Sequence, residues 1–149
     1  MMFSDQRQST TFAIRVALIA SFSLTCLLII DCHRHRLFES EQAVISDLRI
    51  LQAAEQSFYA THGTYADLND LGSDGASLIP RDLSLGARGE YEVRVTASTS
   101  GYSVTARYCG REAKATHRSF YMDQTGVIRE TLGPGAATAK SSRIDGQSN

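Results

Sequence analysis

A run of apolar residues near the start of the chain restricts the possible folds more than any other feature. From Phe12 to Ile30 the only charged residue is Arg15, and Asp31 ends the run. A helix needs about 20 consecutive apolar residues to cross the hydrocarbon core of a bilayer. The run therefore predicts a transmembrane helix over residues 12–31, preceded by a polar segment, residues 1–11.

A cleaved signal peptide is the alternative interpretation of this run. Signal peptides have a shorter apolar core and small residues before the cleavage site, whereas here Ile29, Ile30 and Asp31 come before Cys32. The sequence therefore favours a retained anchor. Arginines are equally frequent on the two sides of the run, so charge alone does not orient the helix.

Composition and cysteine spacing exclude several classes of protein. With 149 residues, the chain can form one compact domain in addition to an anchor. A net charge of -1 argues against a nucleic-acid-binding protein. Cys26, Cys32 and Cys109 have neither a metal-ligand spacing nor that of a disulfide framework. A Cys32–Cys109 bridge is disfavoured, because it would join the membrane edge to a distant strand.

The next segment has the pattern of an amphipathic helix. Residues 38–61 contain no Gly or Pro, and Val44, Leu48, Leu51 and Phe58 recur at helical spacings. Without a helix breaker after the apolar run, we expect one long helix that continues to about residue 62. A short second helix is expected between Thr64 and Gly72.

Beyond residue 89 the pattern changes to that of β-strands. Two segments alternate apolar with polar residues, Glu90–Thr96 and Tyr102–Ala106, and two further strands are predicted at Ser119–Met122 and Val127–Arg129. The last two flank a predicted hairpin turn that ends at Gly126. We expect an α+β head over residues 32–130, in which a roughly four-stranded antiparallel sheet packs on the helix. Residues 131–149 are rich in Gly, Ala and Ser and predict a disordered tail.

The order of these segments resembles that of type IV pilins and pseudopilins. The segments that carry the resemblance are Leu48–Tyr59, His62–Tyr65 with Leu68 and Leu71, Gly101–Ala106 and Arg118–Arg129. The resemblance implies a single-pass protein of a bacterial inner membrane, with a cytoplasmic N-terminus and a periplasmic or extracytoplasmic head. It also implies that the N-terminal helix contacts other pilin-like or envelope assembly proteins.

The chain departs from this family where pilins are processed. No Gly precedes Phe12, no Glu lies early in the apolar run, and Arg15 stands in that region. The Gly-Phe-Thr-Leu-Ile-Glu type of leader junction is therefore missing. These differences predict a pilin-like head on a permanent anchor rather than a filament subunit.

No residue pattern indicates catalysis, a cofactor or a bound metal. His33 and His35 are two residues apart and would point to different sides of a helix. His117 is expected to be solvated, and Glu55 to make a paired contact between helix and head. Most of the aromatic residues are expected to pack the sheet on the helix: Tyr59, Tyr65, Tyr91, Tyr102, Tyr108, Phe120 and Tyr121. The basic residues of the head are expected on a solvated mixed surface: Arg88, Arg94, Arg107, Arg111, Lys114 and Arg118.

These observations predict a non-enzymatic structural or assembly component of a type IV pilus or a type II secretion-like system. The alternative is a tethered extracytoplasmic binding module that does not polymerise. Neither prediction includes a small-molecule substrate, a metal or a nucleic acid.

Overall fold

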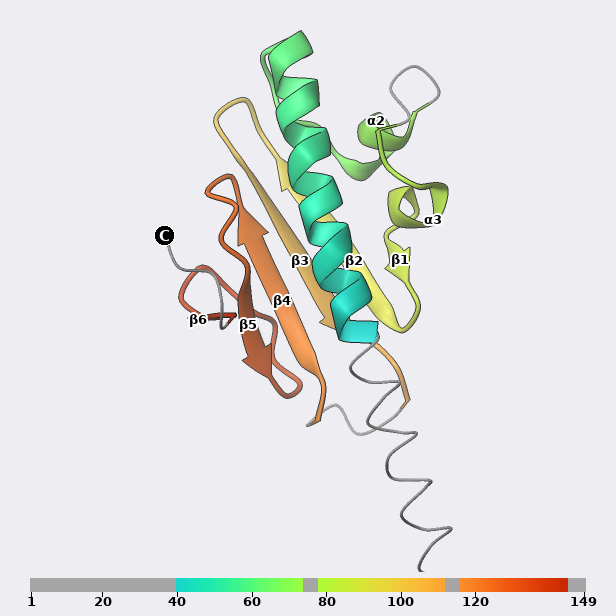
Figure 1. Ribbon diagram of the computed structural model, residues 1–149, viewed down its shortest axis with the longest axis vertical. Coiled ribbons are helices and arrows are strands. Elements are labelled where there is room, and N and C mark those ends of the chain that lie inside the picture. Colours follow the sequence, from blue (N-terminus) through green and yellow to red (C-terminus); the bar gives the residue numbers. More distant parts are fainter. Residues whose placement is uncertain (1–39, 74–77, 112–115, 145–149) are drawn as a thin grey trace, which may run out of the picture. The chain divides into compact units, whose positions relative to one another are not determined.

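The computed structural model describes residues 40–73, 78–111 and 116–144. A helix runs through residues 40–62 and lies across one face of an antiparallel sheet (Figure 1). We call it the long helix. The predicted polar segment 1–11 and the predicted transmembrane helix 12–31 lie outside the described residues. Cys26, Cys32, His33, His35 and Lys114 also lie outside them.

The prediction of a single-pass inner-membrane protein is corrected by this structure. Within the three described ranges, no helix is both long and apolar enough to cross a bilayer. The long helix fails because one side of it is polar, with Gln42, Ser46 and Arg49 exposed to solvent. The apolar run on which the prediction rested lies outside the described ranges.

The sheet has six strands in the order β1-β2-β3-β4-β5-β6, and each strand pairs antiparallel with the next one along the chain. The strands are β1 (Ala87–Arg88), β2 (Tyr91–Ala97), β3 (Tyr102–Tyr108), β4 (Arg118–Asp123), β5 (Arg129–Leu132) and β6 (Ser142–Arg143). The strands form the predicted antiparallel meander, but the predicted pilin-like fold of a long N-terminal helix on about four strands is wrong. The described residues form a helix on a six-stranded sheet.

The two strands that were not predicted lie at the two edges of the sheet. β1 and β6 each contain two exposed residues, too few for an alternating pattern to be recognised in the sequence. β6 lies within the range that was expected to form a disordered tail. The segment before it is held by a hydrogen bond of 2.7 Å between the Thr131 and Ser141 hydroxyl groups. The buried side chain of Ala137 adds packing in the same segment.

The core lies between the long helix and one face of the sheet. Val44, Leu48 and Leu51 of the helix are buried there. In β3, Tyr102, Val104, Ala106 and Tyr108 alternate inward with more exposed residues. Because side chains of a strand alternate between faces, residues 103, 105 and 107 lie on the opposite face, which we call the outer face.

Two short helices close the core beside β1 and β2 (Figure 1). They are α2 (Leu68–Gly72) and α3 (Arg81–Ser84), and each buries one leucine, Leu71 and Leu83 respectively. The second predicted helix is thus confirmed, and its N-cap is Asp67, whose carboxylate accepts hydrogen bonds from two backbone amides of α2. The hairpin turn is also confirmed, since Gly126 has a φ of 74° and donates to the Asp123 carbonyl.

Candidate functional site

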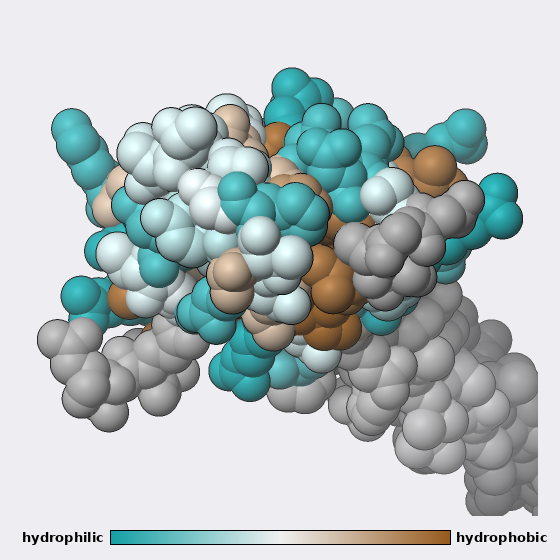
Figure 2. Space-filling model, turned by 90° about the horizontal axis from the view of Figure 1, so that it is seen from above, coloured by the Kyte–Doolittle hydropathy of each residue, from teal (hydrophilic) through white to brown (hydrophobic). Residues whose placement is uncertain are grey.

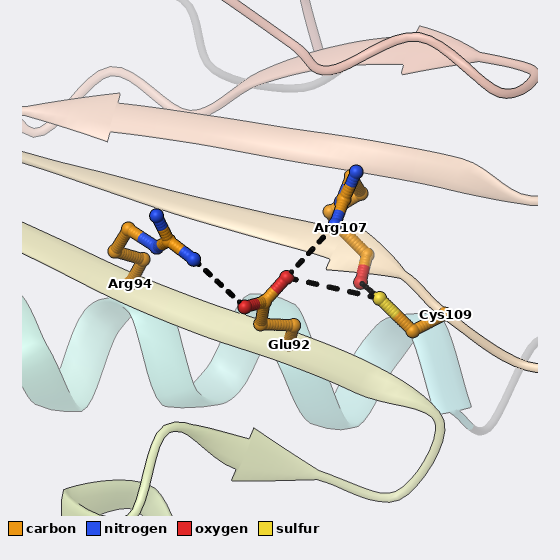
Figure 3. Close-up of polar contacts among 4 residues, drawn as sticks. All are labelled: Glu92, Arg94, Arg107 and Cys109. Carbon is orange, nitrogen blue, oxygen red and sulfur yellow. Dashed lines mark hydrogen bonds and ion pairs between the residues drawn. The ribbon is translucent and has the colours of Figure 1, made fainter.

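Four residues on the outer face of the sheet form a connected group of polar contacts (Figure 3). Arg94 Nη2 donates to Glu92 Oε1 at 2.9 Å, and Arg107 Nη2 donates to Glu92 Oε2 at 3.0 Å. The Cys109 Sγ atom lies 3.9 Å from Glu92 Oε2 and 3.5 Å from the Arg107 carbonyl oxygen. We call these four residues the outer-face cluster.

The pairing of β2 with β3 brings the cluster together. Glu92 lies directly opposite Arg107, and Arg94 lies opposite Thr105. Cross-strand neighbours on one face are close enough for their side chains to interact, and opposite charges then attract. The alternation of β2 was predicted from the sequence, but the register that places Glu92 beside Arg107 was not. Only the strand pairing could reveal this contact.

The charges of the cluster neutralise one another in part. Hydrogen bonds from Arg94 and then from Arg107 lower the pKa of the Glu92 carboxyl group. The hydrogen bond to Glu92 raises the pKa of Arg107 in return. All three side chains are partly or largely exposed, so solvent screens these ion pairs and limits their contribution to stability.

A shallow hollow of about 270 Å³ lies over the cluster, lined by Glu92, Arg94, Thr105, Arg107 and Ala136. Its two guanidinium groups do not form an open anion site, because the Glu92 carboxylate already binds both of them. Among the described residues, the Cys109 thiol makes its contacts with Glu92 and with the Arg107 carbonyl oxygen. The cluster is therefore suited to charge-complementary contact with another surface.

The described part of the chain also offers no metal site. No three or more His, Cys, Asp or Glu side chains in it are grouped so that they could hold an ion.

Glu55 is the most unusual carboxylate of the core. It lies on the buried side of the long helix and is 0% exposed. Its Oε2 atom accepts a hydrogen bond of 3.0 Å from the backbone amide of Ala66, which follows the turn after the helix. The expected contact between helix and head is therefore present, and it fixes the chain where it leaves the helix.

Only one oxygen of Glu55 is paired within the described residues. Its Oε1 atom and the buried hydroxyl group of Tyr102 have no hydrogen-bond partner there. Burial raises the pKa of Glu55, and burial followed by the nearby Glu55 charge raises the pKa of Tyr102 to about 12.

The raised pKa of Glu55 predicts a stability that falls as the pH rises above about 4.5. In that range the unfolded chain has already lost the Glu55 proton, while the folded chain still holds it, so the unfolded state is favoured. We expect Glu55→Gln to remove this part of the pH dependence. Urea unfolding between pH 4.5 and pH 7 measures it. Identical slopes for the wild type and the variant would contradict the prediction.

Asp47 is a second buried carboxylate that the sequence did not single out. Its Oδ2 atom forms an ion pair with Arg88 Nε on β1 at 2.8 Å. Burial raises the pKa of Asp47, and the Arg88 charge lowers it in part. A charged residue between Val44 and Leu51 on the apolar stripe was the signal that could have indicated this ion pair.

The prediction for His117 is wrong. The side chain is 1% exposed, and its ring stacks on Tyr108 with a centroid distance of 3.6 Å. β3 brings Tyr108 to this position from another part of the sheet, so the local loop pattern around His117 could not predict the burial.

Most of the aromatic residues pack in or against the core, as expected. Tyr91, Tyr102, Tyr108 and Phe120 are buried in the core, whereas Tyr59 is exposed. The remaining two of the set, Tyr65 and Tyr121, are partly buried.

The described basic residues of the head, a set without Lys114, lie at the surface as expected, and most of them are paired. Arg88, Arg94, Arg107 and Arg118 form ion pairs with acidic residues, and Arg111 is exposed. The backbone amide of Arg118 donates to Glu41 Oε1 at 3.2 Å, and its side chain pairs with Glu130 at 3.0 Å. These contacts attach the long helix to β4 and β5.

Comparison with known proteins gave no relative. No protein-family description, no curated protein and no solved structure matches this chain.

Proposed function

We propose that this protein is a non-enzymatic structural or assembly component that acts through protein–protein contacts. The resemblance to type IV pilins and pseudopilins, which rests on the sequence, suggests this class. The observation that carries the proposal is the exposed side of the long helix, which lies opposite its buried side and is available for a second helix.

The exposed side has the spacing and the side chains that close helix packing requires. Residues 42, 46, 49, 53, 56, 57 and 60 are exposed and recur at intervals of about one helical turn. Four of them are small, namely Ser46, Ala53, Ser57 and Ala60. Small side chains allow two helix backbones to approach closely, and ridges then fit into grooves.

The rest of the visible surface offers less for apolar association. On the face seen from above, hydrophilic residues and residues of intermediate hydropathy surround a narrower group of hydrophobic residues (Figure 2). The small residues on the exposed side of the long helix therefore favour a specific, reversible contact over non-specific aggregation.

Site-specific photo-crosslinking in the full chain tests the proposal. A benzoylphenylalanine at Ala53 is expected to give covalent homodimers and higher multiples. The same group at Gln124, an exposed position in the hairpin turn, serves as the matched control and is expected to give none. Sedimentation velocity of the purified full chain should then show concentration-dependent association. A chain that stays monomeric and crosslinks to no copy of itself would reject the proposal and favour a binding module that does not polymerise.

A further inference from the structure

One edge of β2 has backbone groups that no neighbouring strand uses. β1 pairs only with Tyr91 and Glu92, and the last contact on this side is the hydrogen bond of 2.9 Å from the Val93 amide to the Gly86 carbonyl. The backbone groups of Val95 and Ala97 point to the same side, because alternate residues of a strand bond to the same neighbour. Within the described residues they have no backbone hydrogen-bond partner.

The free stretch of edge has a defined beginning and end. Gly86 has a φ of 72°, which turns the chain from β1 towards α3 and ends the β1 pairing. At the other end, the Tyr65 amide donates to the Ser98 carbonyl at 3.4 Å. Residues 94–97 remain open between these two contacts, and at about 3.4 Å per residue they can pair with a segment of about four residues.

A groove runs beside this free edge. It has a volume of about 340 Å³ and lies between β2, α2 and the chain that connects α3 with β1. Its apolar lining comes from Leu68, Leu85, Val93 and Val95, and Leu85 is 73% exposed. Its polar lining comes from Asp67, Asn69, Ser84 and Arg94. Unpaired strand edges are templates for further strands, and natural proteins normally cover them.

We propose that this edge, residues 94–97, binds an extended peptide segment of another protein as an added strand. The inference goes beyond the proposed function, because a peptide can bind here whether or not the chain associates with copies of itself. The backbone of Val95 and Ala97 supplies the hydrogen bonds, and the groove receives alternate side chains of the peptide.

The surroundings of the edge select a single peptide strand and not the sheet of a second copy. α2 and α3 lie beside β2 and β1 (Figure 1). Two such edges paired about a two-fold axis would bring both pairs of short helices to the same side of the joined sheet, where they would obstruct each other. An isolated extended segment carries no such helices, so it can lie along β2 beside α2 and α3 without this obstruction.

The side chains around the groove define the chemistry of the peptide. Leu68, Leu85 and Val95 favour aliphatic residues at alternate positions. On the outer face, the largely exposed guanidinium group of Arg94 would lie opposite a residue of the added strand. Because Arg94 is already paired with Glu92, an acidic residue there would share the guanidinium group and gain a weak cross-strand pair. The expected ligand therefore alternates aliphatic with acidic or polar residues.

Nuclear magnetic resonance of the full chain with a synthetic peptide tests the proposal. The probe is a blocked pentapeptide, Glu-Val-Glu-Val-Thr, titrated to about 1 mM, where weak strand addition is measurable. We expect saturable shift changes at Val95 and Ala97, and slower hydrogen exchange of these two amides. No saturable change, or changes at Ser142 and Arg143 on β6 instead, would overturn the proposal.

Two methylated peptides provide a control that needs no change in the protein. One carries N-methyl groups on its valines and the other on its glutamates. Only alternate amides of an added strand face β2, so one isomer should lose binding at least tenfold and the other should keep it. Equal binding of both isomers would show that the peptide does not bind as a strand.

A substitution at Val95 provides the matched test in the protein. Val95→Pro removes an amide that faces the free edge, a position where strands tolerate proline, and should weaken binding at least tenfold. Val95→Ala keeps the amide and should stay within about threefold of the wild type. Equal losses in both variants would contradict the proposal, and if Val95→Pro fails to fold, the methylated peptides still decide the question.

Discussion

Replacing Phe120 by alanine is expected to lower the free energy of unfolding by about 3–5 kcal/mol, the range for a large aromatic residue in a packed core. Phe120 lies in β4, is 1% exposed, and its ring centroid is 6.2 Å from that of Tyr91 in β2. The substitution leaves a cavity that the surrounding strands cannot close without losing their pairing. Urea or guanidinium unfolding of the full chain measures the change.

Leu132→Ala is the matched control for this prediction. Leu132 ends β5 and is 66% exposed, so its truncation should change the free energy of unfolding by less than about 0.5 kcal/mol. A loss of under about 1 kcal/mol in Phe120→Ala, or equal losses in the two variants, would mean that the core is not centred on β4.

Replacing Glu55 by alanine is expected to cost about 2–3 kcal/mol near neutral pH, from a cavity and an unpaired buried amide. The substitution removes the acceptor of the Ala66 amide, which is itself buried. The loss is smaller than the sum of the two effects, because the variant no longer holds a carboxyl group out of water. The chain after the long helix should then exchange its amide hydrogens faster.

Two variants separate the role of Glu55 from a general effect of the helix. Glu55→Gln keeps an oxygen that can accept from Ala66 and should lose less stability than Glu55→Ala. Gln56→Ala changes an exposed neighbour on the same helix and should have almost no effect. A loss in Glu55→Gln as large as that in Glu55→Ala would show that the hydrogen bond to Ala66 is not what Glu55 contributes.

The central elements of this fold could be predicted because their signals are local. The stripe of Val44, Leu48 and Leu51 predicted the long helix up to residue 62, since one helical side must be buried. Alternation predicted β2 and β3, and the hairpin turn predicted β4, each to within two residues at either end. Gly126 predicted the end of the hairpin turn between β4 and β5, where the backbone has a positive φ.

The predictions that failed are those that depended on partners distant in the sequence. β5 begins at Arg129, later than expected, because Ile128 leaves the predicted strand to pack in the core. The expected solvation of His117 failed because Tyr108 covers it. The membrane assignment was drawn from residues outside the described ranges, and no helix within those ranges supports it.

By itself the sequence determined which segments form the long helix and the central strands, because periodic burial depends only on the order of residues along the chain. Only the tertiary structure decided the number of strands, the register that joins Glu92 to Arg107, and the burial of Glu55 against the Ala66 amide. It also decided that, among the described residues, the backbone of Val95 and Ala97 at the edge of β2 has no hydrogen-bond partner. These features arise from hydrogen bonds and packing between segments far apart in the chain, which no local pattern encodes.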